Sequence, residues 1–155
     1  MSVASTSAVR EGLQAYADRK IFRNFKEEKG KDGKTKFTFL YLGDKTVTLE
    51  YTEKDHTLVI RNMLPRVSAS MFADLEAFLE DLFDAALPAY RRIERSSAEV
   101  HFVKKGANVS LVFQVKRNRY RYGMDKIIDL ISWIHIYLQR EHQEYLWRVM
   151  GEPED

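Results

Sequence analysis

The sequence contains no cysteine, only three prolines and seven glycines, and almost no excess of one charge sign over the other. Without cysteine the chain can form no disulfide, no thiolate nucleophile and no cysteine metal ligand, which favours a reducing compartment. Lys and Arg number 25 against 23 Asp and Glu, and the resulting net charge of +2 is too small to indicate a partner by itself. Composition therefore argues against a disulfide-stabilised secreted domain and names no partner.

Long hydrophobic runs are also missing. The most apolar run, residues 127–138, is interrupted by Asp129, Ser132 and His135. A membrane-spanning helix needs roughly 20 apolar residues. Residues 1–7 are small and polar, without the basic segment and apolar run of a signal peptide. We therefore expect a cytoplasmic protein with no membrane contact.

No motif in the chain commits to a reaction. Residues 33–35 resemble the end of a phosphate-binding loop, but Glu28 stands where that motif needs a glycine. No serine lies in a Gly-x-Ser-x-Gly elbow. His135 and His142 are two helical turns apart, which is too far to share one metal ion. We therefore expect a non-enzymatic protein with no catalytic residues, no cofactor and no metal site.

The composition and the spacing of apolar residues are those of an ordinary globular protein. Its 155 residues are 45% hydrophobic and 31% charged, which predicts a single domain over residues 1–155. Apolar residues at helical spacing predict helices at 5–18, from Ser68 or Ser70 to about Leu87, and at 124–150. Alternation and turn signals predict strands at 20–29, 36–42, 46–52, 58–62, 99–104 and 109–116.

This order of elements, α-β-β-β-β-α-β-β-α, predicts an α+β fold. The connections between neighbouring strands are too short for crossovers, so the strands are expected to be antiparallel. We predict a sheet of about five to six strands with the helices packed on one face and a long C-terminal helix.

The predicted order is similar to that of the small dimeric chaperones of type III secretion, which combine a first helix, a strand meander, a helix, a hairpin and a last helix. It is also similar to the four-strands-then-helix unit of some binders of single-stranded nucleic acid. The first resemblance implies a dimeric chaperone, although those chaperones are typically acidic and this chain is not. Neither resemblance rests on a shared motif, and no family is assigned.

The C-terminal helix is apolar on two sides. One stripe carries Met124, Ile127, Ile128, Ile131, Ile134, Leu138, Tyr145, Leu146 and Val149, and the opposite side carries Leu130, Trp133, Ile136, Tyr137 and Trp147. A helix that is apolar on two sides usually makes contacts on both. One side is expected to cover the sheet, and the other contacts another part of the chain, a second subunit or a ligand. Aromatic residues anchor interfaces. We predict a protein partner, most simply in a homodimer, at Trp133, Tyr137, Trp147 and Leu130.

The most unusual local run is the basic and aromatic stretch at residues 116–122. As an extended strand it places three arginines on one face and two tyrosines on the other. Such a strand suits a single strand of nucleic acid, an acidic protein partner, or simply a solvated strand end. The residues predicted to bind nucleic acid or an acidic partner are Arg117, Arg119, Tyr120, Arg121 and Tyr122.

Three functional hypotheses follow from these features. The first is a non-enzymatic protein-interaction module, an adaptor or secretion-chaperone-like protein that is dimeric. The alternative is a single-stranded nucleic-acid-binding domain that uses the basic and tyrosine strand at 116–122. The third is a small-ligand pocket beneath the C-terminal helix, lined by His135 and aromatic residues.

Overall fold

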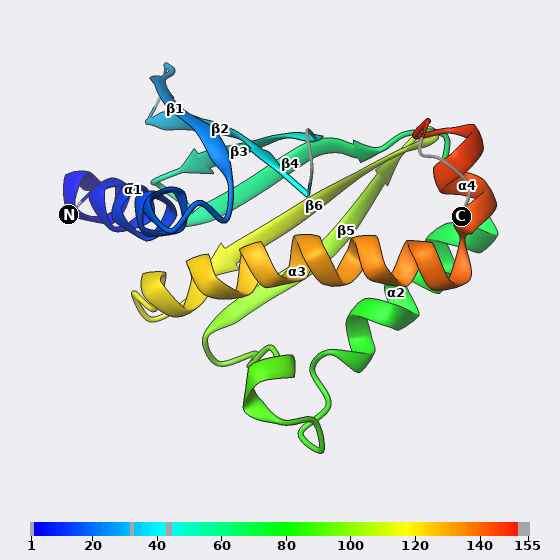
Figure 1. Cartoon of the computed structure of the whole chain (residues 1–155). Coiled ribbons are helices and arrows are strands. Elements are labelled where there is room, and N and C mark those ends of the chain that lie inside the picture. Colours follow the sequence, from blue (N-terminus) through cyan, green and yellow to red (C-terminus); the bar gives the residue numbers. More distant parts are fainter. Residues whose placement is uncertain (1, 32, 43–44, 152–155) are drawn as a thin grey trace.

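The computed structural model describes residues 2–31, 33–42 and 45–151, with side chains from Ser5 onward. The elements in chain order are α1 (Ser2–Asp18), β1 (Arg23–Lys29), β2 (Lys34–Tyr41), β3 (Lys45–Thr52), β4 (Thr57–Leu64), α2 (Ala69–Asp81), the short 3-10 helix η1 (Ala89–Arg91), β5 (Ala98–Lys105), β6 (Asn108–Val115), α3 (Tyr120–Glu141) and α4 (Gln143–Arg148). Figure 1 shows the long α3 running beneath the sheet, with α1 at one end and α2 and α4 at the other.

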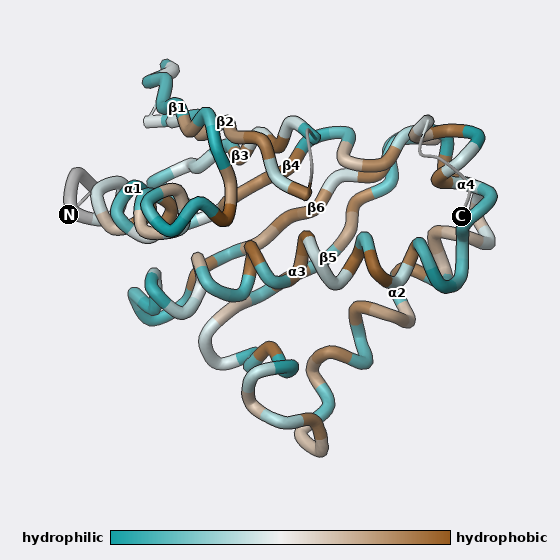
Figure 2. The backbone as a smooth tube through the Cα atoms, in the orientation of Figure 1, coloured by the Kyte–Doolittle hydropathy of each residue, from teal (hydrophilic) through white to brown (hydrophobic). Residues whose placement is uncertain are grey.

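The six strands form one antiparallel sheet in the order β1-β2-β3-β4-β6-β5. The first four strands are a meander, and the β5–β6 hairpin joins it through β6. Buried residues alternate with less buried ones along the strands, so one face of the sheet is apolar. Figure 2 shows hydrophobic and hydrophilic residues interspersed along the strands and α3. The α+β class, the element order and the packing of helices on one face are confirmed.

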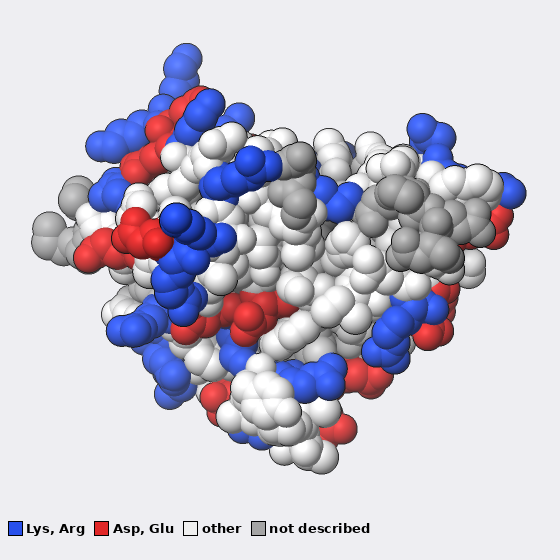
Figure 3. All heavy atoms as spheres, in the orientation of Figure 1, with Lys and Arg blue, Asp and Glu red and all other residues white. Residues whose placement is uncertain are grey.

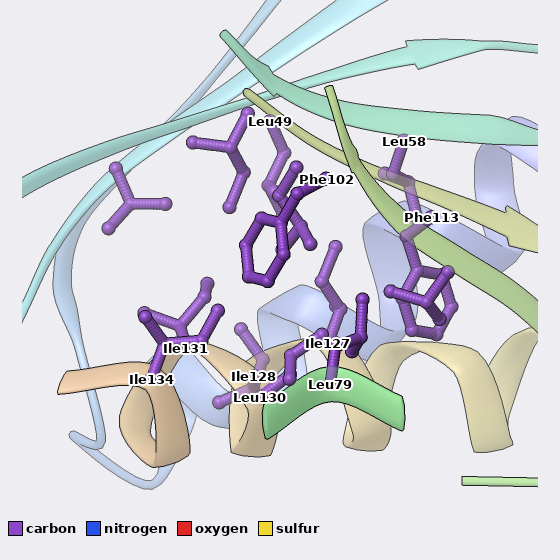
Figure 4. Close-up of a cluster of buried hydrophobic side chains, with 14 of the residues drawn as sticks. Leu49, Leu58, Leu79, Phe102, Phe113, Ile127, Ile128, Leu130, Ile131 and Ile134 are labelled. Carbon is purple, nitrogen blue, oxygen red and sulfur yellow. The ribbon is translucent and has the colours of Figure 1, made fainter. Parts of the chain in front are cut away.

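The core lies between this sheet face and one stripe of α3. Leu58 pairs with Phe113, and both side chains point toward α3 (Figure 4). On the helix, Ile127, Ile131 and Ile134 belong to the same buried cluster and are at most 4% exposed. Burial of this much apolar surface is the main favourable term for the fold.

The C-terminal helix differs from its prediction at both ends. It begins at Tyr120, so Gly123 lies inside it, and it breaks at His142, whose backbone has φ −138 and ψ 46. There is no proline or glycine at the break. The break instead lets α4 turn back onto the sheet, where Leu146 is buried and the Tyr145 hydroxyl donates a 2.6 Å hydrogen bond to the Pro65 carbonyl. One continuous helix over 124–150 is therefore wrong.

The second helix is shorter than the apolar periodicity indicates. Ser68 caps its start, as expected, by accepting a 3.1 Å hydrogen bond from the Met71 N–H. The helix ends at Asp81 and not near Leu87. The Asp84 carboxylate accepts from the Ala86 N–H at 2.9 Å, and this local bond competes with a further helical turn.

Gly12 lies where α1 comes closest to α3. A Cβ atom at this position would be 2.6 Å from the Cγ and 2.9 Å from the Cβ of Met124, whose side chain is fully buried. The glycine, which weakens the helical pattern in the sequence, is thus required by a close approach of two helices.

We expect the substitution Gly12→Ala to lower the free energy of unfolding by about 1–3 kcal/mol, because the added methyl group overpacks the contact with Met124. Alanine favours an exposed helix by about 1 kcal/mol over glycine, so propensity alone predicts the opposite sign. Urea denaturation measures the difference. Gln14→Ala, at an exposed position of the same helix, is the matched control and should change stability little. An equally stable or more stable Gly12→Ala would contradict the packing.

Candidate functional site

The basic and aromatic run at 116–122 is not a strand. β6 ends at Val115, and Arg117 and Asn118 follow with φ of 53 and 55, which make a tight turn. The remaining residues enter the first turn of α3. The alternation of arginine and tyrosine faces predicted for this stretch is therefore wrong, because a turn reverses the chain before a second face can form.

Several side chains of this turn are bound to the loop before β5. The Arg117 Nε donates a 2.9 Å hydrogen bond to the Ser96 carbonyl, and Arg119 Nη1 donates to Ser97 Oγ at 3.1 Å. The Tyr122 hydroxyl accepts from the Glu94 N–H at 2.8 Å. Of the residues predicted to bind nucleic acid, Arg121 alone has an exposed side chain without such a bond to a described residue. Binding of nucleic acid stays a prediction from the sequence.

Tyr120 is the centre of a buried hydrogen-bond network at this end of the sheet. It is 6% exposed, its hydroxyl lies 2.8 Å from that of Tyr51, and it also contacts His56 Nδ1. Burial, followed by the hydrogen bond with Tyr51, raises the pKa of Tyr120 above its ordinary value. The network ties the start of α3 to β3 and to the turn before β4, and it keeps the Tyr120 ring away from any ligand that stacks.

A hollow of about 770 Å³ lies on the outer side of α3, between α3, α2 and η1, and we call it the aromatic hollow. Two of its residues are strongly exposed, Tyr90 at 72% and Ile136 at 46%. Trp133 and Tyr137 also line the hollow and are half-buried. In Figure 3 an area of uncharged atoms covers the upper middle of the molecule, and charged side chains lie at its ends and below it. The hollow itself combines the exposed apolar side chains of Tyr90 and Ile136 with charged side chains of α2 and α3.

Intrachain contacts hold the walls of the aromatic hollow rigid. The Tyr137 ring stacks on Phe78 of α2 with centroids 4.4 Å apart. Lys126, which is 6% exposed, donates from Nζ to the Ala89 carbonyl at 2.9 Å and lies 5.6 Å from the Trp133 ring. Burial lowers the pKa of Lys126, against the opposing charge of Asp129. Wall residues fixed in this way lose little side-chain entropy on binding.

The four residues predicted to contact a partner do not lie together. Leu130 is 0% exposed and belongs to the core, so its side chain is not part of a surface. Trp133 and Tyr137 line the aromatic hollow, whereas Trp147 is 47% exposed on α4, outside the hollow. Tyr90 was missed because a single aromatic residue after Pro88 in a linker gives no periodic signal.

His135 lines a second cavity, on the sheet side of α3. This groove has a volume of about 450 Å³ and lies between β3, β4, α3 and α4. Its position is where the small-ligand hypothesis expects a cavity, and the ligand itself stays a prediction. His142 is not in this lining, because it sits at the helix break with Nε2 3.3 Å from the Asp74 carboxylate.

The described residues contain no group of three or more His, Asp or Glu side chains placed to hold a metal ion. None of their helices is long and apolar enough to span a bilayer.

Comparisons of the chain with protein-family models, with curated proteins and with solved structures found no significant match. The similarities to type III secretion chaperones and to nucleic-acid binders thus remain similarities of element order. The class that the structure itself defines is an α+β domain with a one-sided helical layer.

Tyr145 connects α4 to the end of β4, and burial raises its pKa to about 12. An unfolded tyrosine loses its proton near pH 10, so the folded state holds the proton over a window in which the unfolded state does not. The stability that Tyr145 contributes is therefore present below pH of about 10 and is lost as the pH rises toward 12.

We expect Tyr145→Phe to lower the free energy of unfolding by about 1 kcal/mol at neutral pH, because the hydrogen bond to Pro65 is lost. Between pH of about 9 and about 11 the parent should lose more stability than the variant, and urea denaturation at both values measures this. Equal losses in the two proteins would show that Tyr145 does not titrate in this way.

Proposed function

We propose that this chain is a non-enzymatic protein-interaction module and that two copies associate through the aromatic hollow. The observation that carries the proposal is the exposure of Tyr90 and Ile136, at 72% and 46%, around the fixed rings of Trp133 and Tyr137. Aromatic residues concentrated at the centre of a concave patch are typical of interface hot spots. Contact of an exposed apolar patch with water is unfavourable, and burial of the patch against a partner is therefore favourable.

Charges on the two walls favour a second copy as this partner. Asp81 lies on α2 and Arg140 on α3, on opposite walls of the aromatic hollow. Neither side chain has an ion pair with another described residue. A two-fold axis through the hollow would bring Asp81 of each copy to Arg140 of the other, giving two equivalent pairs. A patch with this self-complementary arrangement is what an isologous dimer needs.

As a dimer, the module would act as an adaptor or secretion-chaperone-like protein. The helices cover one face of the sheet, and on the opposite face His101 and Val103 of β5 are exposed. Association through the aromatic hollow leaves this sheet face accessible in both copies. Two copies of one binding face in a single particle raise the effective concentration for a partner protein.

We expect light scattering to give the parent twice the chain mass of 18.2 kDa, and Ile136→Glu to give the single mass. A buried carboxylate at the centre of the interface would be unpaired, whereas in one copy Ile136 is 46% exposed, so the change should leave the fold intact. Val103→Glu, at a similarly exposed residue on the sheet face, is the matched control and should stay dimeric. A monomeric parent, or a monomeric Val103→Glu with a dimeric Ile136→Glu, would overturn the proposed interface.

A charge exchange tests the arrangement of the two copies. Asp81→Arg and Arg140→Asp should each weaken dimerisation about tenfold or more, because each creates two like-charge contacts per dimer. The double variant restores opposite charges at both contacts and should recover most of the parent affinity. Additive losses in the double variant would mean that Asp81 and Arg140 do not meet across the two-fold axis.

A further inference from the structure

The sheet opens between β3 and β4. These strands pair only at Thr52–Thr57, Tyr51–Leu58 and Glu50–Val59. On its other side β3 pairs with β2 over its whole length, down to Lys45. Residues 45–49 of β3 are therefore bonded as a strand on one side only, although they lie inside the sheet and not at its edge.

A bulge in β4 causes the opening. Ile60 and Leu64 of β4 are opposite Leu111 and Val109 of β6, so β4 uses two more residues than its partner over this span. Asn62 has a φ of 49, and its N–H donates to the Ser110 side chain at 2.9 Å instead of to a ladder carbonyl. Bulges bend a strand away from its neighbours. Residues 61–63 accordingly have no partner in β3.

The opening is the groove of about 450 Å³ that His135 lines. Its floor is apolar and is made by Ile131, Ile134, Leu138 and Leu146 of the two C-terminal helices. Its walls are the unpaired parts of β3 and β4. The groove thus combines two interrupted strand edges with an apolar floor, which is what the interior position of a β-strand in this sheet would offer.

We propose that the groove binds an extended segment of a partner protein as an additional strand between β3 and β4. Unpaired strand edges are templates for such addition, and the segment's main chain would continue both interrupted ladders. Five residues of β3 span about 16 Å at roughly 3.3 Å per residue, so a segment of about five residues fits. Because β3 and β4 are antiparallel, the inserted strand is antiparallel to one of them and parallel to the other.

The residues that line the groove also determine which types of side chain the bound segment should carry. Every second residue would face the floor beside Val47 and Ile60 and should be apolar, whereas the others would face the open side of the sheet. On that side Glu50 accepts from Arg61 Nε at 2.8 Å, so the opposite charges of these two side chains are matched within the chain. The polar positions of the segment need no particular charge, and threonine or glutamate suits them. This site is separate from the aromatic hollow and does not depend on dimerisation.

The test uses the full chain and a labelled synthetic peptide of about eight residues in which valine alternates with threonine and glutamate. Fluorescence anisotropy measures its binding. A second peptide has the same side chains with alternate backbone nitrogens methylated, which removes hydrogen-bond donors. We expect the methylated peptide to bind about tenfold more weakly or worse. In hydrogen exchange, backbone amides in 45–49, and those of Arg61 and Met63, should become protected when the unmethylated peptide binds.

Variants locate the binding in the groove. His135→Trp fills the groove and should weaken peptide binding about tenfold or more, whereas Gln139→Trp, exposed one turn further along α3, should not. Circular dichroism checks that both fold, and Met63→Trp fills the groove from β4 if His135→Trp unfolds. Equal binding of the methylated and unmethylated peptides would overturn strand addition, and so would no binding of either peptide. A groove that binds the fatty acid dodecanoate but not the peptide would also overturn it, because it would be a site for an apolar small molecule. None of these results bears on the mass of the dimer.

Discussion

Burial of one apolar stripe of α3 against one face of the sheet is the contact on which the rest of this structure depends. Phe113 on β6 and Ile127 on the helix belong to its fully buried part. α1 is positioned by its close approach to α3 at Gly12. α2 is positioned by its packing on β5 and by the stack of Phe78 on Tyr137. Removal of α3 would therefore uncover the middle of the sheet face, and α1 and α2 would keep only their contacts with the sheet.

The same helix separates the two candidate sites. Trp133 faces the aromatic hollow and its neighbour Ile134 faces the groove, so consecutive residues serve opposite sides. Neither site could lie where it does without a departure from regular structure. The hollow needs α2 to end at Asp81, and the groove needs the bulge at Asn62. The helices and strands form the walls of the two cavities. The helix end at Asp81 and the bulge at Asn62 determine where these cavities lie.

Much of the fold could be predicted because the spacing of apolar residues in a strand or a helix follows directly from which of its sides is buried. Phe37 and Phe39 alternate along β2, and Ile127, Ile131 and Ile134 follow the period of α3. What could not be predicted depends on partners distant in sequence. Tyr120 is drawn into the core by hydroxyl contact with Tyr51, so the predicted strand at 116–122 became a turn and a helix start. The break at His142 and the exposure of Tyr90 likewise have no local signal.

The order of the strands has a consequence for how the chain folds. β4 lies between β3 and β6, so the middle of the sheet joins a meander to a hairpin that is synthesised only after α2. Until β6 and α3 arrive, Tyr51 lacks its contact with Tyr120 and Leu58 lacks its neighbour Phe113, although both side chains are fully buried in the folded chain. Closure of the large loop between β4 and β6 lowers the conformational entropy of the chain before the contacts between these strands form and compensate for that loss. Folding of the N-terminal half must therefore wait for the C-terminal half, and a nascent chain that stops after β4 is an aggregation-prone species.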